Sequence, residues 1–371
     1  MNTQSMLKIT ILIVLLFVSQ SYALSTPNIS ANALFLYRNS NFHKADKDPL
    51  NLDSDPNGLD IQETELQIYS DVDPYTRLNL VLSIAPSYES DGTAVEQKWG
   101  IEPEEAFVES NILPSTTLKI GKFKAFMGKQ NLLHTHAFSF IESPLINKNL
   151  LGDEGLNDVG FSAAVLLPAA WYSELTLQYL RGKGENAEFN SPSPSEGVGL
   201  AHWKNLFDLT SDLTLEVGTS YASGMNSFKK ITSLVGADLT LKWRPTTAGN
   251  TQFVAWATEY LGRTQAQSNF DDEKGSGLVS WIQYQFIERW SVLYRFDSLK
   301  IENTFDSAAL PNQTSSRHSA GLMFSPSEFS NYKLEFDQRK NDVANANNET
   351  VEKTIYLQAN FTIGTHPSHS Y

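Results

Sequence analysis

The segment DLTLEVGTSYA, which runs from Asp212 to Ala222, alternates apolar and polar side chains with a period of two. Its apolar positions are Leu213, Leu215, Val217 and Tyr221, and its polar positions are Thr214, Glu216, Gly218 and Ser220. Successive side chains of an extended chain point to opposite sides, so this pattern predicts a β-strand with one apolar face and one polar face.

The same alternation recurs along the chain. Clear cases lie at residues 171–181, 234–243, 290–298, 332–339 and 355–363. Weaker cases fill the gaps, at residues 29–38, 60–71, 75–85, 103–111, 116–127, 157–167, 196–206, 249–261, 276–287 and 316–325. Together they predict an all-β fold of about sixteen antiparallel strands, and an even count suits a closed transmembrane β-barrel.

Long and short connections alternate between these segments. The long ones lie near residues 39–59, 86–102, 128–156, 182–195, 223–230, 262–275, 299–315 and 340–350. Outer-membrane barrels have long extracellular loops and short periplasmic turns, so this alternation favours such a barrel with both chain ends on the periplasmic side. A soluble protein of two packed β-sheets, or a propeller, is the structural alternative.

The first residues predict a secretory signal peptide over residues 1–23. Lys8 precedes an apolar run from Ile9 to Val18, and small residues flank Tyr22 in the sequence Ser21-Tyr22-Ala23. The run is too short for a membrane-spanning helix, which needs about twenty residues. A buried N-terminal helix is the alternative. Residues 24–371 are then expected to form one barrel domain.

Composition narrows the classes of function. The chain has a formal net charge of −14, which argues against nucleic acid as a partner, and it has no cysteine, which excludes disulfides and thiolate metal sites. No residue constellation supports an enzyme. His136 and Ser139 are the nearest candidates for a catalytic pair, but no catalytic motif surrounds them.

The polar strand faces are expected to line the lumen, because a basic side chain facing lipid at the midplane costs about 2–4 kcal/mol. Aromatic residues near strand ends would form the interfacial girdles: Trp171, Tyr221, Trp243, Tyr260, Trp290, Tyr332 and Phe361. The expected lumen charges are Glu65, Glu105, Glu109, Glu174, Glu216, Asp238, Glu259, Asp297, Glu335 and Asp337, against Arg77, Lys242, Arg295, Lys333 and Arg339. This excess of acids predicts a weak cation preference, although many of these charges could simply pair across strands.

The third long connection, residues 128–156, is too apolar for a solvated loop and is expected to fold into the lumen. It carries His134 and His136, which would point the same way in an extended segment. We expect the pore constriction to contain His134, His136 and Glu142, with Lys122 and Lys124 beside them. The histidine pair could bind zinc with a third ligand from Glu142, Asp153, Glu154 or Asp158. The alternative is two histidines hydrogen-bonded inside the folded loop.

Part of the chain resembles known outer-membrane families. EEAFVE at 104–109, Leu113-Pro114, LKIGKFK at 118–124 and MGKQN at 127–131 resemble phosphate-selective porins of the O and P type. LHTHAF at 133–138, LLGDEGLNDVG at 150–160 and LLP at 166–168 resemble a little-characterised family labelled zinc-regulated TonB-dependent outer membrane receptors. The resemblance implies a porin-like barrel. A receptor of that type would need a 22-stranded barrel and a plug, for which this chain is too short.

These observations predict an outer-membrane porin of a Gram-negative bacterium, through which small hydrophilic solutes or ions diffuse passively. Expected partners are outer-membrane lipid, these solutes or ions, the barrel assembly machinery, which a terminal aromatic such as Tyr371 suits, and two further copies in a homo-trimer. No cofactor is expected apart from zinc at the histidine pair. The alternative function is a zinc-binding or adhesive barrel, closed by its loops and without transport.

Overall fold

The computed structural model describes residues 26–42, 57–90, 95–152, 154–184, 188–193, 196–246, 251–268, 271–302, 313–342 and 348–364. The strands are β1 (Asn28–Ser40), β2 (Gly58–Asp73), β3 (Thr76–Ser90), β4 (Val95–Leu113), β5 (Thr116–Lys124), β6 (Asn157–Leu166), β7 (Tyr172–Leu180), β8 (Val198–Asp208), β9 (Leu213–Met225), β10 (Ile231–Trp243), β11 (Phe253–Gln265), β12 (Glu273–Ile287), β13 (Trp290–Glu302), β14 (Gln313–Ser327), β15 (Ser330–Asn341) and β16 (Val351–Gly364). The predicted signal peptide lies outside the described residues.

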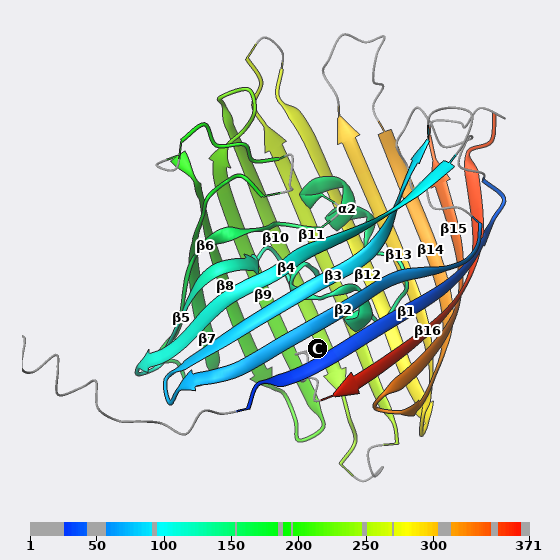
Figure 1. The fold of residues 1–371 in the computed structure, drawn as a ribbon, viewed down its shortest axis with the longest axis horizontal. Coiled ribbons are helices and arrows are strands. Elements are labelled where there is room, and N and C mark those ends of the chain that lie inside the picture. The colour runs from blue at the N-terminus through cyan, green and yellow to red at the C-terminus, as the bar shows by residue number, and fades with distance from the viewer. Residues whose placement is uncertain are drawn as a thin grey trace, which may run out of the picture.

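These strands form one closed antiparallel barrel (Figure 1). Each strand pairs with its neighbours in the sequence, and β1 closes the barrel by pairing with β16 from Ser30 opposite Gly364 to Ser40 opposite Thr354. Closure gives every strand two neighbours, as a membrane barrel requires, but the outer part of the β3–β4 hairpin extends beyond both of its neighbours: β2 pairs with β3 only as far as Thr64 opposite Ile84, and β5 pairs with β4 only as far as Lys122 opposite Ala106. The prediction of a sixteen-stranded barrel is confirmed, and all the predicted segments fall on observed strands.

The second predicted long loop, residues 86–102, is mostly strand in the structure. Strands β3 and β4 remain paired up to Ser90 opposite Val95, so only residues 91–94 separate them. This hairpin extension escaped sequence reasoning because the segment does not alternate apolar and polar residues. Here the pairing between the two backbones continues without an alternating pattern of apolar side chains.

The outer surface of the barrel is apolar and carries aromatic residues near the strand ends. All the predicted girdle residues are at least one third exposed on this surface: Trp171, Tyr221, Trp243, Tyr260, Trp290, Tyr332 and Phe361. Aliphatic side chains such as Leu177 and Val235 lie between them on the outer face. Within the described residues, no helix combines the length and the hydropathy that a membrane crossing would require.

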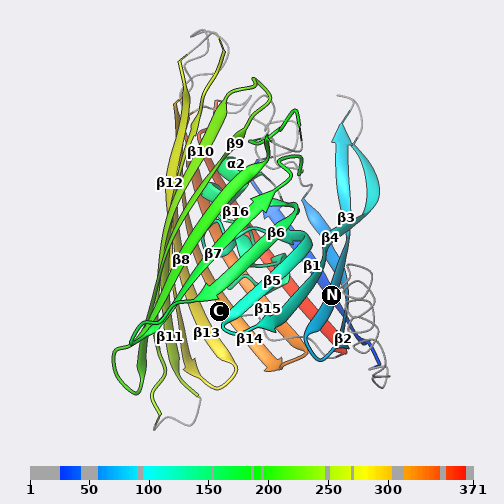
Figure 2. The same cartoon turned by 90° about the vertical axis from the view of Figure 1, so that its left-hand side faces the viewer.

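The segment 125–156 between β5 and β6, called loop 3 here, folds into the barrel (Figures 1 and 2). It contains two short 3-10 helices, η2 (Gln130–Leu132) and η3 (Thr135–Ala137), and the helix α2 (Leu145–Leu151). Helix α2 packs against β11, β12 and β13. The apolar side chains of this segment, from which we predicted such packing, are thus buried against the barrel wall.

Two glycines of β12 make room for α2. A Cβ atom at Gly275 would lie 2.5 Å from Leu150, and one at Gly277 would lie 2.5 Å from Ile146. Both α2 side chains are fully buried, in a cluster shared with inward-facing wall residues such as Leu261. Because glycine has no side chain, the helix can approach the sheet closely at this point.

Candidate functional site

Loop 3 enters the lumen through a neck that the wall holds by hydrogen bonds. The backbone N–H groups of Lys129 and Gln130 donate to Glu259 Oε2 at 2.8 and 2.9 Å. Lys129 Nζ donates to Glu216 Oε1 at 2.8 Å. Glu216 and Glu259 were predicted lumen charges, whereas the role of Lys129 was missed because no strand register applies to a loop.

His134 lies among carboxylates of the opposite wall. Its Nδ1 atom is 2.9 Å from Glu104 Oε2 and 3.5 Å from Glu65 Oε1, and its Nε2 atom is 3.4 Å from Glu105 Oε2. The imidazole is buried, with 6% of its surface exposed. Burial alone would lower the pKa of His134, but the charges of Glu104 and Glu65 raise it well above its usual value.

His136 joins the same cluster. Its Nδ1 atom lies 2.7 Å from Glu65 Oε2, and its ring stacks on His134 with the centroids 5.8 Å apart. The two imidazoles therefore meet one carboxylate, as the expected shared direction of their side chains implied. The constriction residues His134 and His136 thus belong to the contact between loop 3 and β2.

A third metal ligand was expected within loop 3 or at the start of β6, but the described residues bring together a different set of possible ligand atoms. Glu65, Glu104 and His134 present ligand atoms within 4.8 Å of one another, so the acids come from β2 and β4. Asp158 instead accepts from the backbone of Lys183 at 2.9 Å. None of Glu142, Glu154 and Asp158 is in this group of ligand atoms, and Asp153 lies outside the described residues.

A bulge brings Glu104 into the lumen. Glu105 pairs with Val81, but the next pair joins Pro103 to Leu82, so Glu104 is an extra residue in β4. Both Glu104 and Glu105 consequently point inward. A strict period of two assigns them to opposite faces, which is why Glu104 was not among the predicted lumen charges.

Of the two lysines expected at the constriction, Lys124 contacts a carboxylate there. Lys124 is buried and lies 2.7 Å from Glu104 Oε1. Lys122 pairs with Ala106 and Val159 and shares the outward register of Ile120, which is 49% exposed. The place of Lys122 at the constriction therefore stays a prediction, whereas Lys119, which was not predicted, lies 3.9 Å from Glu109.

Glu142 contributes to the constriction through its backbone. Its carbonyl oxygen accepts from Arg295 Nη1 at 2.6 Å. Arg295 is completely buried, and its Nε atom lies 3.1 Å from Asp297 Oδ2. Arg317 donates to the carbonyl oxygen of Ser143 at 2.7 Å and also to Asp297. These arginines hold the middle of loop 3 against β13 and β14.

All the predicted lumen charges share the register of inward-facing side chains, including Arg77, Glu174 and Asp238. Further inward-facing bases were not predicted: Arg38, Lys119, Lys204, Arg263 and Arg317. Many of the charges form pairs, such as Arg38 with Glu352 at 2.8 Å. Inward-facing acids were also missed, among them Glu63, Glu104 and Glu352, so both the acids and the bases of the lumen exceed the predicted set.

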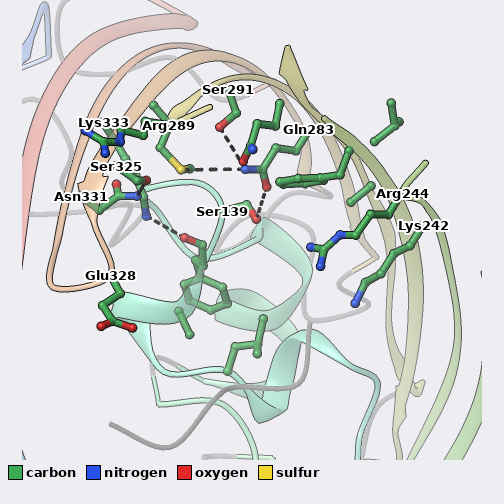
Figure 3. Close-up of a pocket in the computed structure, with 18 of the residues that line it drawn as sticks. Ser139, Lys242, Arg244, Gln283, Arg289, Ser291, Ser325, Glu328, Asn331 and Lys333 are labelled. Atoms are coloured by element: carbon green, nitrogen blue, oxygen red, sulfur yellow. Dashed lines mark hydrogen bonds between the residues drawn. The ribbon is translucent and has the colours of Figure 1, made fainter. Parts of the chain in front are cut away.

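A cavity of about 1260 Å³ lies between loop 3 and the short turns. Figure 3 shows Lys242 and Arg244 on one side of it, Lys333 and Asn331 on the other, and Ser139 of loop 3 between them. Its charged lining residues are the bases Lys129, Lys242, Arg244, Arg289 and Lys333 and the acids Asp212 and Glu328. We call this cavity the vestibule, and its lining is mainly basic.

His136 and Ser139 do not form a catalytic pair. Ser139 donates to Gln283 Oε1 of β12 at 2.9 Å (Figure 3), whereas His136 faces Glu65 of β2. A nucleophile and its base must lie within hydrogen-bond distance of each other. These two side chains are instead held by different walls of the barrel.

No family model matches the sequence. A protein of Aquifex aeolicus (strain VF5), described only as uncharacterised, is 28% identical over 350 residues, covering 85% of this chain and 70% of that protein.

The barrel is similar to solved outer-membrane proteins. OmpT of Vibrio cholerae matches with a TM-score of 0.57 at 7% identity, over 93% of this chain and 99% of that one. An anion-selective porin from Comamonas acidovorans gives 0.55 at 10% identity, over 92% and 99%. The outer membrane channel DcaP of Acinetobacter baumannii gives 0.57 at 9% identity, over 93% and 99%. The chain therefore has the fold of outer-membrane porins and channels of Gram-negative bacteria.

Proposed function

We propose that this protein is an outer-membrane porin through which small hydrophilic solutes or ions diffuse passively. The observation that carries the proposal is a closed barrel with an apolar exterior, a charged interior and loop 3 folded inside above a vestibule of about 1260 Å³. The short turns then face the periplasm.

The distribution of charge supports low selectivity. The basic vestibule attracts anions, whereas the carboxylates beside His134 attract cations. The weak cation preference expected from the sequence rested on ten predicted acids against five predicted bases. We therefore propose a channel with little net charge selectivity. Selectivity for phosphate, the property named in the porin-type resemblance, is not part of this proposal.

Assembly as a homo-trimer is part of the proposal. One solved form of OmpT of Vibrio cholerae, with a TM-score of 0.54 at 9% identity, is described as a trimer. Chemical cross-linking of the protein in outer-membrane vesicles should give a band of three chains.

A second candidate function is zinc handling. The specific observation that favours it is the position of His134 between Glu65 and Glu104, together with the resemblance of residues 133–168 to the zinc-regulated family. The receptor mechanism in that family's label is not part of the proposal, because the described barrel has sixteen strands. A barrel of that size is of the porin type.

The test is single-channel current through the refolded chain from residue 24 onward, in a planar bilayer under a salt gradient. Steady conductance with a reversal potential close to zero is expected. A reversal potential close to the equilibrium potential of one ion would overturn the proposed low selectivity but would still support a channel. No conductance in repeated insertions would overturn the channel and favour an adhesive or structural barrel closed by its loops.

A further inference from the structure

Three ligand atoms converge where loop 3 meets β2 and β4. His134 Nδ1 lies 2.9 Å from Glu104 Oε2 and 3.5 Å from Glu65 Oε1. Each of the three residues is at least nine-tenths buried. They come from three separate segments of the chain, so the fold alone brings them together.

Neighbouring side chains hold the other polar atom of each of these residues. The contacts are Lys124 Nζ to Glu104 Oε1 at 2.7 Å, His136 Nδ1 to Glu65 Oε2 at 2.7 Å, and Glu105 Oε2 to His134 Nε2 at 3.4 Å. Metal-binding imidazoles usually make such a contact to a carboxylate through the second ring nitrogen. Each residue therefore directs its remaining atom, Oε2, Oε1 or Nδ1, toward the same point.

Buried carboxylates gather around this point. Glu65 Oε1 and Glu63 Oε2 are buried and accept no hydrogen bond from the described residues. The carboxylates of Glu65, Glu104 and Glu105 contact His134, and that of Glu65 also contacts His136. A divalent cation at His134 would place positive charge between Glu65 and Glu104. Uncompensated buried charge is costly.

We propose that His134, Glu65 and Glu104 bind one divalent cation of the zinc class. Zinc is bound by imidazole nitrogen and carboxylate oxygen at about 2.0–2.2 Å, which places tetrahedral ligands roughly 3.3–3.5 Å apart. The observed separations of 2.9 and 3.5 Å from Nδ1 need only small shifts to reach this spacing. Calcium and magnesium prefer oxygen ligands alone, so the imidazole favours zinc or a similar ion.

Such an ion would connect loop 3 to two strands of the wall. Binding releases the Nδ1 proton of His134 to solvent and replaces an ion pair by coordination bonds. The consequence for current rests on the proposed channel function: an ion that fixes the loop against β2 and β4 would reduce the fluctuations of single-channel conductance. Metal binding itself does not depend on transport, so the two can be tested separately.

The primary test is calorimetric titration of the folded, detergent-solubilised protein with Zn²⁺ alone. All variants carry His366→Ala and His369→Ala, because these tail histidines could bind zinc independently. One ion per chain is expected in this background. Cobalt substitution gives a second readout, because tetrahedral Co²⁺ with nitrogen and oxygen ligands absorbs in the visible range.

Variants distinguish the residues that would bind the metal ion directly from the residues that only position them. His134→Ala and the isosteric Glu104→Gln should each abolish the binding and the cobalt absorption. His136→Gln should weaken zinc binding about 10–100-fold, as expected for a residue that positions a ligand. Glu109→Gln, a carboxylate of the same strand outside the cluster, is the matched control and should bind zinc like the background protein.

The proposal can be tested even if one variant folds poorly. Heat-modifiable migration on SDS gels reports whether each barrel is folded, and Glu104→Gln replaces His134→Ala if the latter fails. Absence of zinc binding in the folded background protein would overturn the proposal and leave an ion-paired cluster. Unchanged binding in Glu104→Gln would also overturn it. In either case, the conductance measurement would still decide whether the protein is a channel.

Discussion

Loop 3 meets the barrel wall in two regions of opposite chemistry. On β11 to β13, the side chains of Ile146 and Leu150 of α2 pack onto a surface opened by Gly275 and Gly277, and polar contacts there reach the backbone of α2. On β2 and β4, the histidines of loop 3 contact buried carboxylates. Apolar burial is insensitive to ions and protons, whereas attraction between ionisable groups depends on both. The contact of α2 with β11 to β13 thus fixes loop 3, whereas the contact of the histidines with β2 and β4 can change with pH and ion concentration.

The largest expected effect comes from breaking the connection between these regions. Arg295→Met removes the guanidinium that binds the Glu142 carbonyl and pairs with Asp297. Removing one partner of a buried ion pair costs about 3–5 kcal/mol, because the other charge stays buried without compensation. The free energy of unfolding in urea, measured in detergent micelles, checks this.

Arg77→Met is the matched control for Arg295→Met. Arg77 also pairs with an aspartate, Asp71 at 2.9 Å, but both side chains are more than half exposed. Exposed pairs contribute about 0–1 kcal/mol. Equal losses in the two variants would show that burial does not decide the strength of the loop's attachment.

Shortening an apolar side chain of α2 should have the next largest effect on the free energy of unfolding. Leu150→Ala removes a fully buried side chain of α2, which should cost about 2–5 kcal/mol. Leu177→Ala, on the outer face with 52% exposure, should cost much less in the same detergent. If stability is unchanged in Leu150→Ala while conductance rises, α2 would be a movable gate and not the fixed side of the loop.

The barrel could be predicted from the sequence because it depends on local alternation. Ser220 and Tyr221 are neighbours in the chain, and one is buried inside while the other is exposed outside. This contrast is visible in the residue types alone. The apolar residues of loop 3 likewise revealed its burial, since no extracellular loop of that composition would remain in water.

The charged side of the site could not be predicted in full. Glu104 points inward only because a bulge shifts the register of β4, and a bulge leaves no signature in the period of the sequence. The partners of His134 lie on strands far from it in the chain, so proximity in sequence suggested Asp158 instead.

The smallest expected effect lies at the neck between the two regions. Lys129→Met removes an ion pair that is partly exposed, and Lys204 lies 3.8 Å from the same carboxylate of Glu216. Because Lys204 can compensate, the loss of stability should be about 1 kcal/mol or less. Lys129 also lines the vestibule, so its removal should shift the reversal potential slightly toward cations. Lys300→Met, a replacement of an exposed lysine paired with Glu302, should change neither quantity. A change in stability without a shift in reversal potential would mean that Lys129 holds the neck but does not face the ion path.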